Sequence, residues 1–113
     1  MSKKIVICLN SAWNLINYRT GLVKALLKLK YEVIVLAPHD KFVKEVENLG
    51  CSYVPIKIDN KGKNPLKDFL FFLSLYSLLR KIRPRIFLGF TIKPNIYGSI
   101  ACNILGIKFI NNI

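Results

Sequence analysis

Residues 4–37 read KIVICLNSAWNLINYRTGLVKALLKLKYEVIVLA, and this stretch decides the fold class. Short runs rich in β-branched residues at 4–9 and 32–37 predict two buried strands. Between them, apolar residues at helical spacing predict a helix over 18–30, with Asn17 as its N-cap. Residues 10–17 are polar and are expected to form the loop before this helix. The pattern predicts two parallel strands joined by a crossover helix.

The rest of the chain repeats this alternation. Further strands are expected at 51–56, 85–90 and 107–111, and further helices at 41–49, 66–82 and 94–105. We therefore predict an α/β, Rossmann-like parallel sheet in the order 3-2-1-4-5, with helices on both faces. A finished domain of this class would cover the face beyond the fifth strand with another helix. We accordingly expect residues 1–113 to be a partial, truncated domain.

The predicted topology places a binding crevice at the carboxyl ends of strands 1 and 4, where the strand order reverses. Residues 10–19 and 90–98 lie at that edge. In the first segment, Arg19 and neighbouring amides are suited to a phosphate or to sugar hydroxyls, or merely cap the backbone. Trp13 either stacks on a sugar or base, or anchors the core. In the second segment, Thr91 and Lys93 precede a helix start, which suits a phosphate.

Composition narrows the function classes. The 113 residues carry a net charge of +12, which favours anionic partners or reflects a solvated lysine-rich surface. The sequence has no GxGxxG, Walker A or GxSxG motif, so dinucleotide binding, P-loop chemistry and a hydrolase elbow are excluded. No acidic residue is expected beside the crevice, so no carboxylate base is nominated. Of the anionic partners, phosphorylated substrates and acidic lipid are favoured, and no nucleic acid is expected.

The cysteines and the N-terminus indicate a cytoplasmic protein. Cys8, Cys51 and Cys102 are widely spaced in apolar runs, which predicts buried free thiols in a reducing compartment and no metal site. The first apolar run is too short for a signal peptide, and no run reaches the ~18 residues of a membrane span.

The helix expected at 66–82 is apolar on two sides. One side must cover the sheet, and basic residues flank the helix at both ends. We predict that Phe71, Leu75 and Leu78 form the second side and face an anionic membrane surface. The alternative is burial of this side against other parts of the protein.

Two stretches resemble family 4 glycosyltransferases, specifically the amino-terminal domain of capsule and lipid-linked-oligosaccharide transferases. They are NLINYRTGLVKALLKLKYEVIVLAP (14–38) and FTIKPNIYGSIACNILGIKFINNI (90–113). The resemblance implies half of a two-domain architecture that transfers a sugar from a nucleotide-sugar to an acceptor, often an isoprenoid-diphosphate saccharide at the inner membrane face. It implies no cofactor and no metal, with the nucleotide-sugar as co-substrate.

Carried over by position, the resemblance implies an acceptor-binding set of Asn17, Arg19, Thr91, Lys93 and Asn95. The nucleotide-sugar would be held by a carboxy-terminal domain, so the catalytic residues are not assigned and the chain alone is expected to be inactive. Two other functions fit the same sequence. One is a non-catalytic subunit of a split transferase that binds a membrane or a second chain, and the other is a nucleotide-sugar epimerase-like domain.

Overall fold

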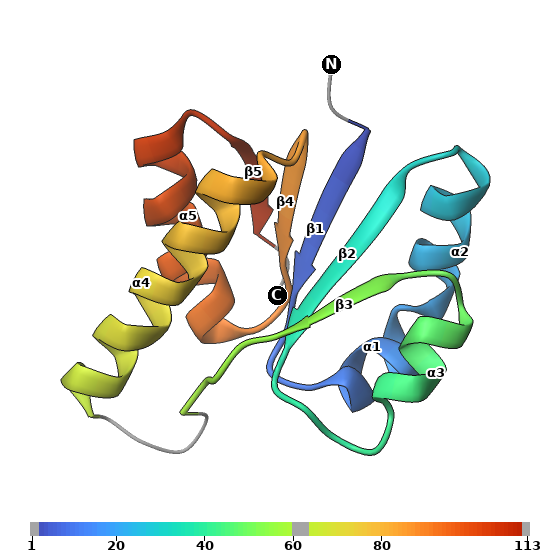
Figure 1. Cartoon of the computed structure of the whole chain (residues 1–113), viewed down its shortest axis with the longest axis horizontal. Coiled ribbons are helices and arrows are strands. Elements are labelled where there is room, and N and C mark those ends of the chain that lie inside the picture. Colours follow the sequence, from blue (N-terminus) through green and yellow to red (C-terminus); the bar gives the residue numbers. More distant parts are fainter. Residues whose placement is uncertain (1–2, 60–63, 112–113) are drawn as a thin grey trace.

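The computed structural model describes residues 3–59 and 64–111, which form a parallel five-stranded sheet flanked by helices (Figure 1). The strand order is β3-β2-β1-β4-β5, as predicted. The strands are β1 (Lys4–Cys8), β2 (Glu32–Ala37), β3 (Ser52–Pro55), β4 (Ile86–Gly89) and β5 (Lys108–Asn111). The helices are α1 (Ala12–Tyr18), α2 (Thr20–Lys28), α3 (Val43–Asn48), α4 (Pro65–Ile82) and α5 (Ile92–Leu105).

The segment predicted as a loop at 10–17 contains the additional helix α1. Ser11 is its N-cap, because the Ser11 side chain accepts a hydrogen bond from the backbone N–H of Asn14 at 3.1 Å. Asn17 is not an N-cap, and its side-chain amide instead donates to the Trp13 carbonyl oxygen at 2.9 Å. The short helix forms because this cap and the buried side chains of Ala12 and Leu15 fix one face of it against the core.

Helix α5 begins at Ile92, two residues before the predicted start at Pro94. The first-turn N–H groups of a helix have no intrahelical partner, so Pro94 is tolerated inside that turn. The helix ends as predicted at Gly106, whose φ of 72° is in the left-handed region. Thr91 is the N-cap residue, although its hydroxyl makes no capping hydrogen bond.

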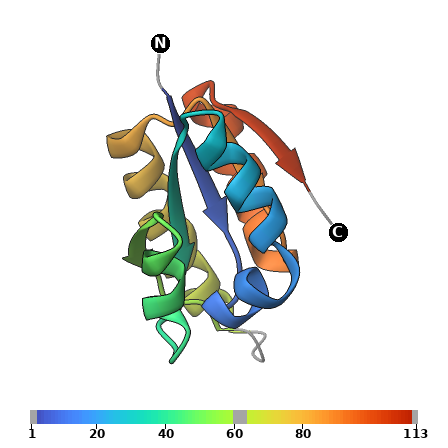
Figure 2. The ribbon, with the colours of Figure 1, turned by 90° about the vertical axis from the view of Figure 1, so that its right-hand side faces the viewer.

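The sheet separates two hydrophobic clusters. Helices α1, α2 and α3 cover one face, where Ile7, Val35 and Leu15 are buried. Helices α4 and α5 cover the other, where Phe71, Leu75 and Phe87 are buried. Strand β5 forms one edge of the sheet, beside the C-terminus (Figure 2).

The prediction that Phe71, Leu75 and Leu78 face a membrane is wrong. The side chains of Phe71 and Leu75 are 2% and 0% exposed, and Leu78 packs partly buried against the same cluster. The sequence shows two apolar sides on this helix, and the side that contains these residues is the one that covers the sheet. The exposed apolar side of α4 is instead formed by Leu66, Phe69, Leu70 and Leu73.

Within residues 3–59 and 64–111, no helix is long and apolar enough to cross a membrane. The three cysteines are buried and unpaired, as predicted. Residues 60–63 of the predicted basic loop lie outside the described residues.

Candidate functional site

The candidate site lies at the carboxyl ends of β1 and β4, which are adjacent in the sheet although α1 and α5 leave them toward opposite faces (Figure 1). The backbone joins the two strands up to this edge, because the Phe90 N–H donates to the Cys8 carbonyl oxygen at 3.1 Å. Immediately beyond it, Asn10 follows β1 and Thr91 follows β4. This is the reversal point at which ligands bind in open parallel sheets.

Arg19 connects the two sides of this crevice. It occupies the junction between α1 and α2, yet its guanidinium lies 4.5 Å from the centroid of the buried Phe90 ring beyond β4. A guanidinium over an aromatic face is held by a cation–π interaction while its N–H groups remain directed at other partners. The Nε of Arg19 is buried and makes no hydrogen bond. The sequence does not identify Phe90 as a site residue. Its position directly after a strand, at the predicted crevice, is the feature of the sequence that could have indicated this role.

Thr91 and Asn95 supply polar atoms from the β4 side. The Thr91 hydroxyl is buried without a hydrogen bond, and the Asn95 N–H donates to the Thr91 carbonyl oxygen at 2.9 Å. The Asn95 side chain lies directly over Gly89, because a Cβ at that glycine would come within 2.6 Å of the Asn95 Oδ1. The absent side chain of Gly89 therefore makes the space in which Asn95 sits at the crevice.

Unsatisfied polar atoms concentrate at this place. An unmade hydrogen bond from a buried polar group costs about 1–3 kcal/mol, so such atoms are uncommon unless a ligand satisfies them. The Arg19 Nε and the Thr91 Oγ1 come from different ends of the described chain, and both are at the β1–β4 reversal point. The arrangement can accept an anion or hydroxyl groups, which is the chemistry expected of the sequence.

Lys93 has a different environment. Its ammonium donates to Asp68 Oδ1 at 2.7 Å and to the carbonyl oxygen of Asp59. The Tyr97 hydroxyl donates to the second carboxylate oxygen of Asp68 at 3.3 Å. Lys93 thus joins α5 to α4 and to the segment after β3, and its charge is compensated by Asp68. Lys93 is therefore engaged between α4 and α5 and is not part of the group of residues at the crevice.

Asn17 is exposed on α1, and its side-chain amide is engaged by the Trp13 carbonyl oxygen. Of the five residues of the predicted acceptor-binding set, Arg19, Thr91 and Asn95 are thus brought to the crevice. Lys93 pairs with Asp68 of α4, and Asn17 makes a local contact within α1.

A carboxylate does lie at this edge, contrary to the sequence expectation. Both oxygens of Asp40 accept backbone hydrogen bonds, from Trp13 N–H at 3.1 Å and from Phe42 N–H at 2.8 Å. Asp40 therefore fixes the start of α1 to the segment after β2. Burial raises the pKa of the Cys8 thiol well above its usual range, which argues against Cys8 as a nucleophile below the crevice. Among the described residues, no cluster of three or more His, Cys, Asp or Glu side chains is arranged for a metal ion.

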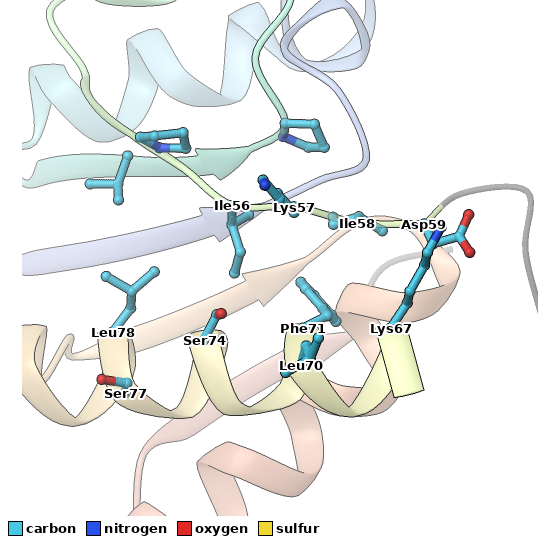
Figure 3. Close-up of a pocket in the computed structure, with 13 residues that line it drawn as sticks. Ile56, Lys57, Ile58, Asp59, Lys67, Leu70, Phe71, Ser74, Ser77 and Leu78 are labelled. Atoms are coloured by element: carbon cyan, nitrogen blue, oxygen red, sulfur yellow. The ribbon is translucent and has the colours of Figure 1, made fainter. Parts of the chain in front are cut away.

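A second concavity lies between α4 and the segment that follows β3 (Figure 3). It has a volume of about 890 Å³, and Ile56, Phe71 and Leu78 form part of its apolar wall. Lys67 and Asp59 lie toward the end at which the strands terminate, and Ser77 and Leu78 lie toward the other. The groove therefore combines an apolar floor with charged groups at the carboxyl edge of the sheet.

The family profile described as "Glycosyl transferase 4-like" matches residues 4–113. No sequence among curated proteins matches the chain.

Solved structures show the same fold at low sequence identity. A glycosyltransferase from Rickettsia africae superposes with a TM-score of 0.77 at 17% identity, over 97% of this chain and 29% of its own. MurG from Acinetobacter baumannii superposes with a TM-score of 0.75 at 15% identity, over 96% of this chain and 34% of MurG. A UDP-N-acetylglucosamine 2-epimerase superposes with a TM-score of 0.68 at 17% identity, over 98% of this chain and 33% of the epimerase. The chain thus spans about a third of the length of these proteins.

Proposed function

The chain belongs to the glycosyl transferase 4-like family, and we propose that it forms the acceptor-binding part of an enzyme that transfers a sugar from a nucleotide-sugar to a saccharide acceptor. The observation that carries the proposal is the position of Arg19 over the ring of Phe90, the residue before Thr91, since Arg19 and Thr91 each have a buried polar atom that makes no hydrogen bond. An acceptor with anionic and hydroxyl oxygens would satisfy both atoms.

The described residues bind and orient the acceptor in this proposal and perform no chemical step. The nucleotide-sugar is a co-substrate held by a carboxy-terminal domain or by a second chain, and this chain by itself does not turn over. The structures that share the fold include an epimerase as well as transferases, so the fold alone does not separate these activities. The family match favours the transferase.

The acceptor is, in this proposal, linked to a lipid through a diphosphate, and the protein works at the inner face of the membrane. Support comes from the exposed side of α4, where Leu66, Phe69 and Leu73 are 65%, 55% and 43% exposed. Leu70 is shared between this side and the apolar groove. Exposed apolar side chains next to Lys67 on a strongly basic chain suit an anionic lipid surface.

The proposal is tested by two-dimensional amide NMR of the isotope-labelled chain. We expect a short-chain farnesyl diphosphate-linked sugar to shift the amide signals of Arg19, Thr91 and Asn95, and a UDP-sugar to leave them unchanged. Loss of one charge-assisted hydrogen bond costs about 1.5–3 kcal/mol, so Arg19→Gln should weaken acceptor binding roughly 10- to 150-fold.

Arg80→Gln is the matched control, because Arg80 is exposed near the far end of α4. Shifts of the same three signals by the UDP-sugar alone would place the donor here and contradict the proposal. So would an Arg19→Gln variant that binds as tightly as the parent.

The membrane part is tested separately by sedimentation with vesicles of phosphatidylglycerol and phosphatidylcholine. Replacing Phe69 and Leu73 with Ser should reduce binding to the acidic vesicles without changing the circular dichroism spectrum, because both side chains are exposed. Unchanged sedimentation of this variant would exclude the α4 surface.

A further inference from the structure

An exposed aromatic pair lies on α1, next to the crevice. Trp13 and Tyr18, which we call the aromatic platform, are 43% and 66% exposed. Their rings meet edge to face with centroids 5.6 Å apart. Phe87 and Phe90, in contrast, are buried in the two hydrophobic clusters. The exposure of Trp13 removes one of the two roles expected for it, because an anchor of the core would be buried.

The backbone beneath the platform is fixed at several points. The Trp13 N–H donates to Asp40 Oδ2 at 3.1 Å, and the Trp13 carbonyl oxygen accepts from the Asn17 side chain at 2.9 Å. Ala12 and Leu15, on the opposite side of α1, are completely buried. An aromatic side chain on a rigid backbone loses little conformational entropy when it binds a ligand. The backbone that carries Trp13 is therefore held in place although the ring faces solvent.

We infer that the aromatic platform binds a pyranose ring of the saccharide acceptor, an inference that rests on the proposed function and assigns the sugar its place. The apolar C–H face of a pyranose carries partial positive charge and stacks on the electron-rich face of an indole. Neutral amides can hydrogen-bond sugar hydroxyl groups at the ring edge, and α1 carries one such side chain in Asn14.

The Asp40 carboxylate favours sugar hydroxyl groups over a phosphate next to Trp13. Asp40 is one of only six acidic residues in a chain of net charge +12, and its carboxylate is hydrogen-bonded to the Trp13 backbone. A carboxylate accepts hydrogen bonds from hydroxyl groups and repels phosphate. Arg19 directly follows Tyr18 in the chain, so an anionic group at Arg19 and a sugar on the platform are compatible with one extended acceptor.

Trp13 is the only tryptophan of the chain, so its fluorescence reports on the platform alone. The probes are farnesyl diphosphate and the same compound carrying glucose, galactose or N-acetylglucosamine. We expect at least one sugar-bearing probe to change the Trp13 emission and to protect it from acrylamide quenching. The sugar-free probe should leave the emission unchanged while still shifting the Arg19 amide signal.

Variants separate the platform from general binding. Tyr18→Ala should weaken the sugar-bearing probe about two- to tenfold, which corresponds to one aromatic contact. It should leave the sugar-free probe unaffected. Trp13→Ala, measured by NMR titration, should weaken the sugar-bearing probe by at least about tenfold and make the two probes equal. Leu29→Ala, which removes an exposed apolar side chain at the end of α2, is the control and should change neither affinity.

The outcomes distinguish this inference from the proposed function. If all probes bind at Arg19 but none changes the Trp13 emission, the platform does not hold the sugar and the proposed function survives. If no probe binds at Arg19, the proposed function fails. Uridine monophosphate that quenches Trp13 as effectively as the sugar-bearing probe would identify a base-stacking site and overturn the inference.

Discussion

Replacing Gly98 with Ala tests the packing that positions α5 over the sheet. Ordinarily this change in a helix interior stabilises a protein by about 0.5–1 kcal/mol, because Gly loses more backbone entropy on folding. Here a Cβ would come within 2.3 Å and 2.6 Å of two ring atoms of Phe87, which is completely buried in β4. The missing side chain of Gly98 thus allows the Phe87 ring to approach α5 closely.

The two effects oppose each other, and the packing term is the larger. The Phe87 ring must move by about 1 Å to restore ordinary contact distances, and overpacking a core costs about 1–3 kcal/mol. Subtracting the central propensity gain of about 0.75 kcal/mol from the central packing cost of about 2 kcal/mol, we expect Gly98→Ala to lower the free energy of unfolding by about 1 kcal/mol. For a domain of this size that corresponds to roughly 3–8 °C in Tm.

Urea denaturation followed by circular dichroism measures the change. Gly21→Ala in α2 is the matched control, because a Cβ there would meet no atom within 4 Å. It should raise the free energy of unfolding by about 0.5–1 kcal/mol. Adding Phe87→Leu to Gly98→Ala should cost less than the sum of the two single changes. A Gly98→Ala variant as stable as the parent would refute the reasoning, since the ring would then yield freely.

Three further predictions concern the core, the ion pair and the thiols. Leu75→Ala should cost about 2–5 kcal/mol of unfolding free energy because Leu75 is completely buried. Leu70→Ala on the exposed side of α4 should cost less than about 0.5 kcal/mol in the same urea titration. Asp68→Asn should destabilise the protein by about 1–2 kcal/mol, because it removes the carboxylate that pairs with the partly buried Lys93, and a neutral result would show that the pair is not structural. Burial raises the pKa of the Cys8 thiol, so the unfolded state ionises first on alkalinisation. Unfolding free energy should therefore fall above pH ~8.5, with Cys8 contributing up to about 1.4 kcal/mol per pH unit. Burial also raises the pKa of the Cys51 and Cys102 thiols, so a Cys8→Ala variant should show a shallower fall with pH and not lose it.

The strand order was predictable because apolar strands alternate with helices, and because right-handed crossovers leave few arrangements. Helix α1 was not, since its residues are mostly polar and the capping role of Ser11 depends on one side-chain hydrogen bond. The inward side of α4 was also unpredictable, because both of its sides are apolar and only packing against Phe87 and its neighbours selects one.

The sequence predicted which two segments form the candidate site, because the carboxyl ends of β1 and β4 must meet in this topology. The roles of the individual side chains in these segments could not be predicted. The partner of Lys93 is Asp68, which lies 25 residues earlier in the sequence, so no local pattern reveals it. The contact of Arg19 with Phe90 likewise depends on how α1 turns into α2.

The central pairing of β1 with β4 has a consequence for how the chain folds. Ile5 lies opposite Ile86, whereas the other three strand pairings join consecutive strands of the chain. Closing so long a loop carries an entropic cost that must be met before the contacts form, and such non-local pairing slows folding. Strands β1 to β3 and strands β4 and β5 are each connected locally, so each set assembles from nearby residues. The sheet is then completed by one late event, the docking of β4 along the open edge of β1. During synthesis this edge stays unpaired until residue 89 has left the ribosome, which makes the nascent chain most prone to wrong strand pairing in that interval.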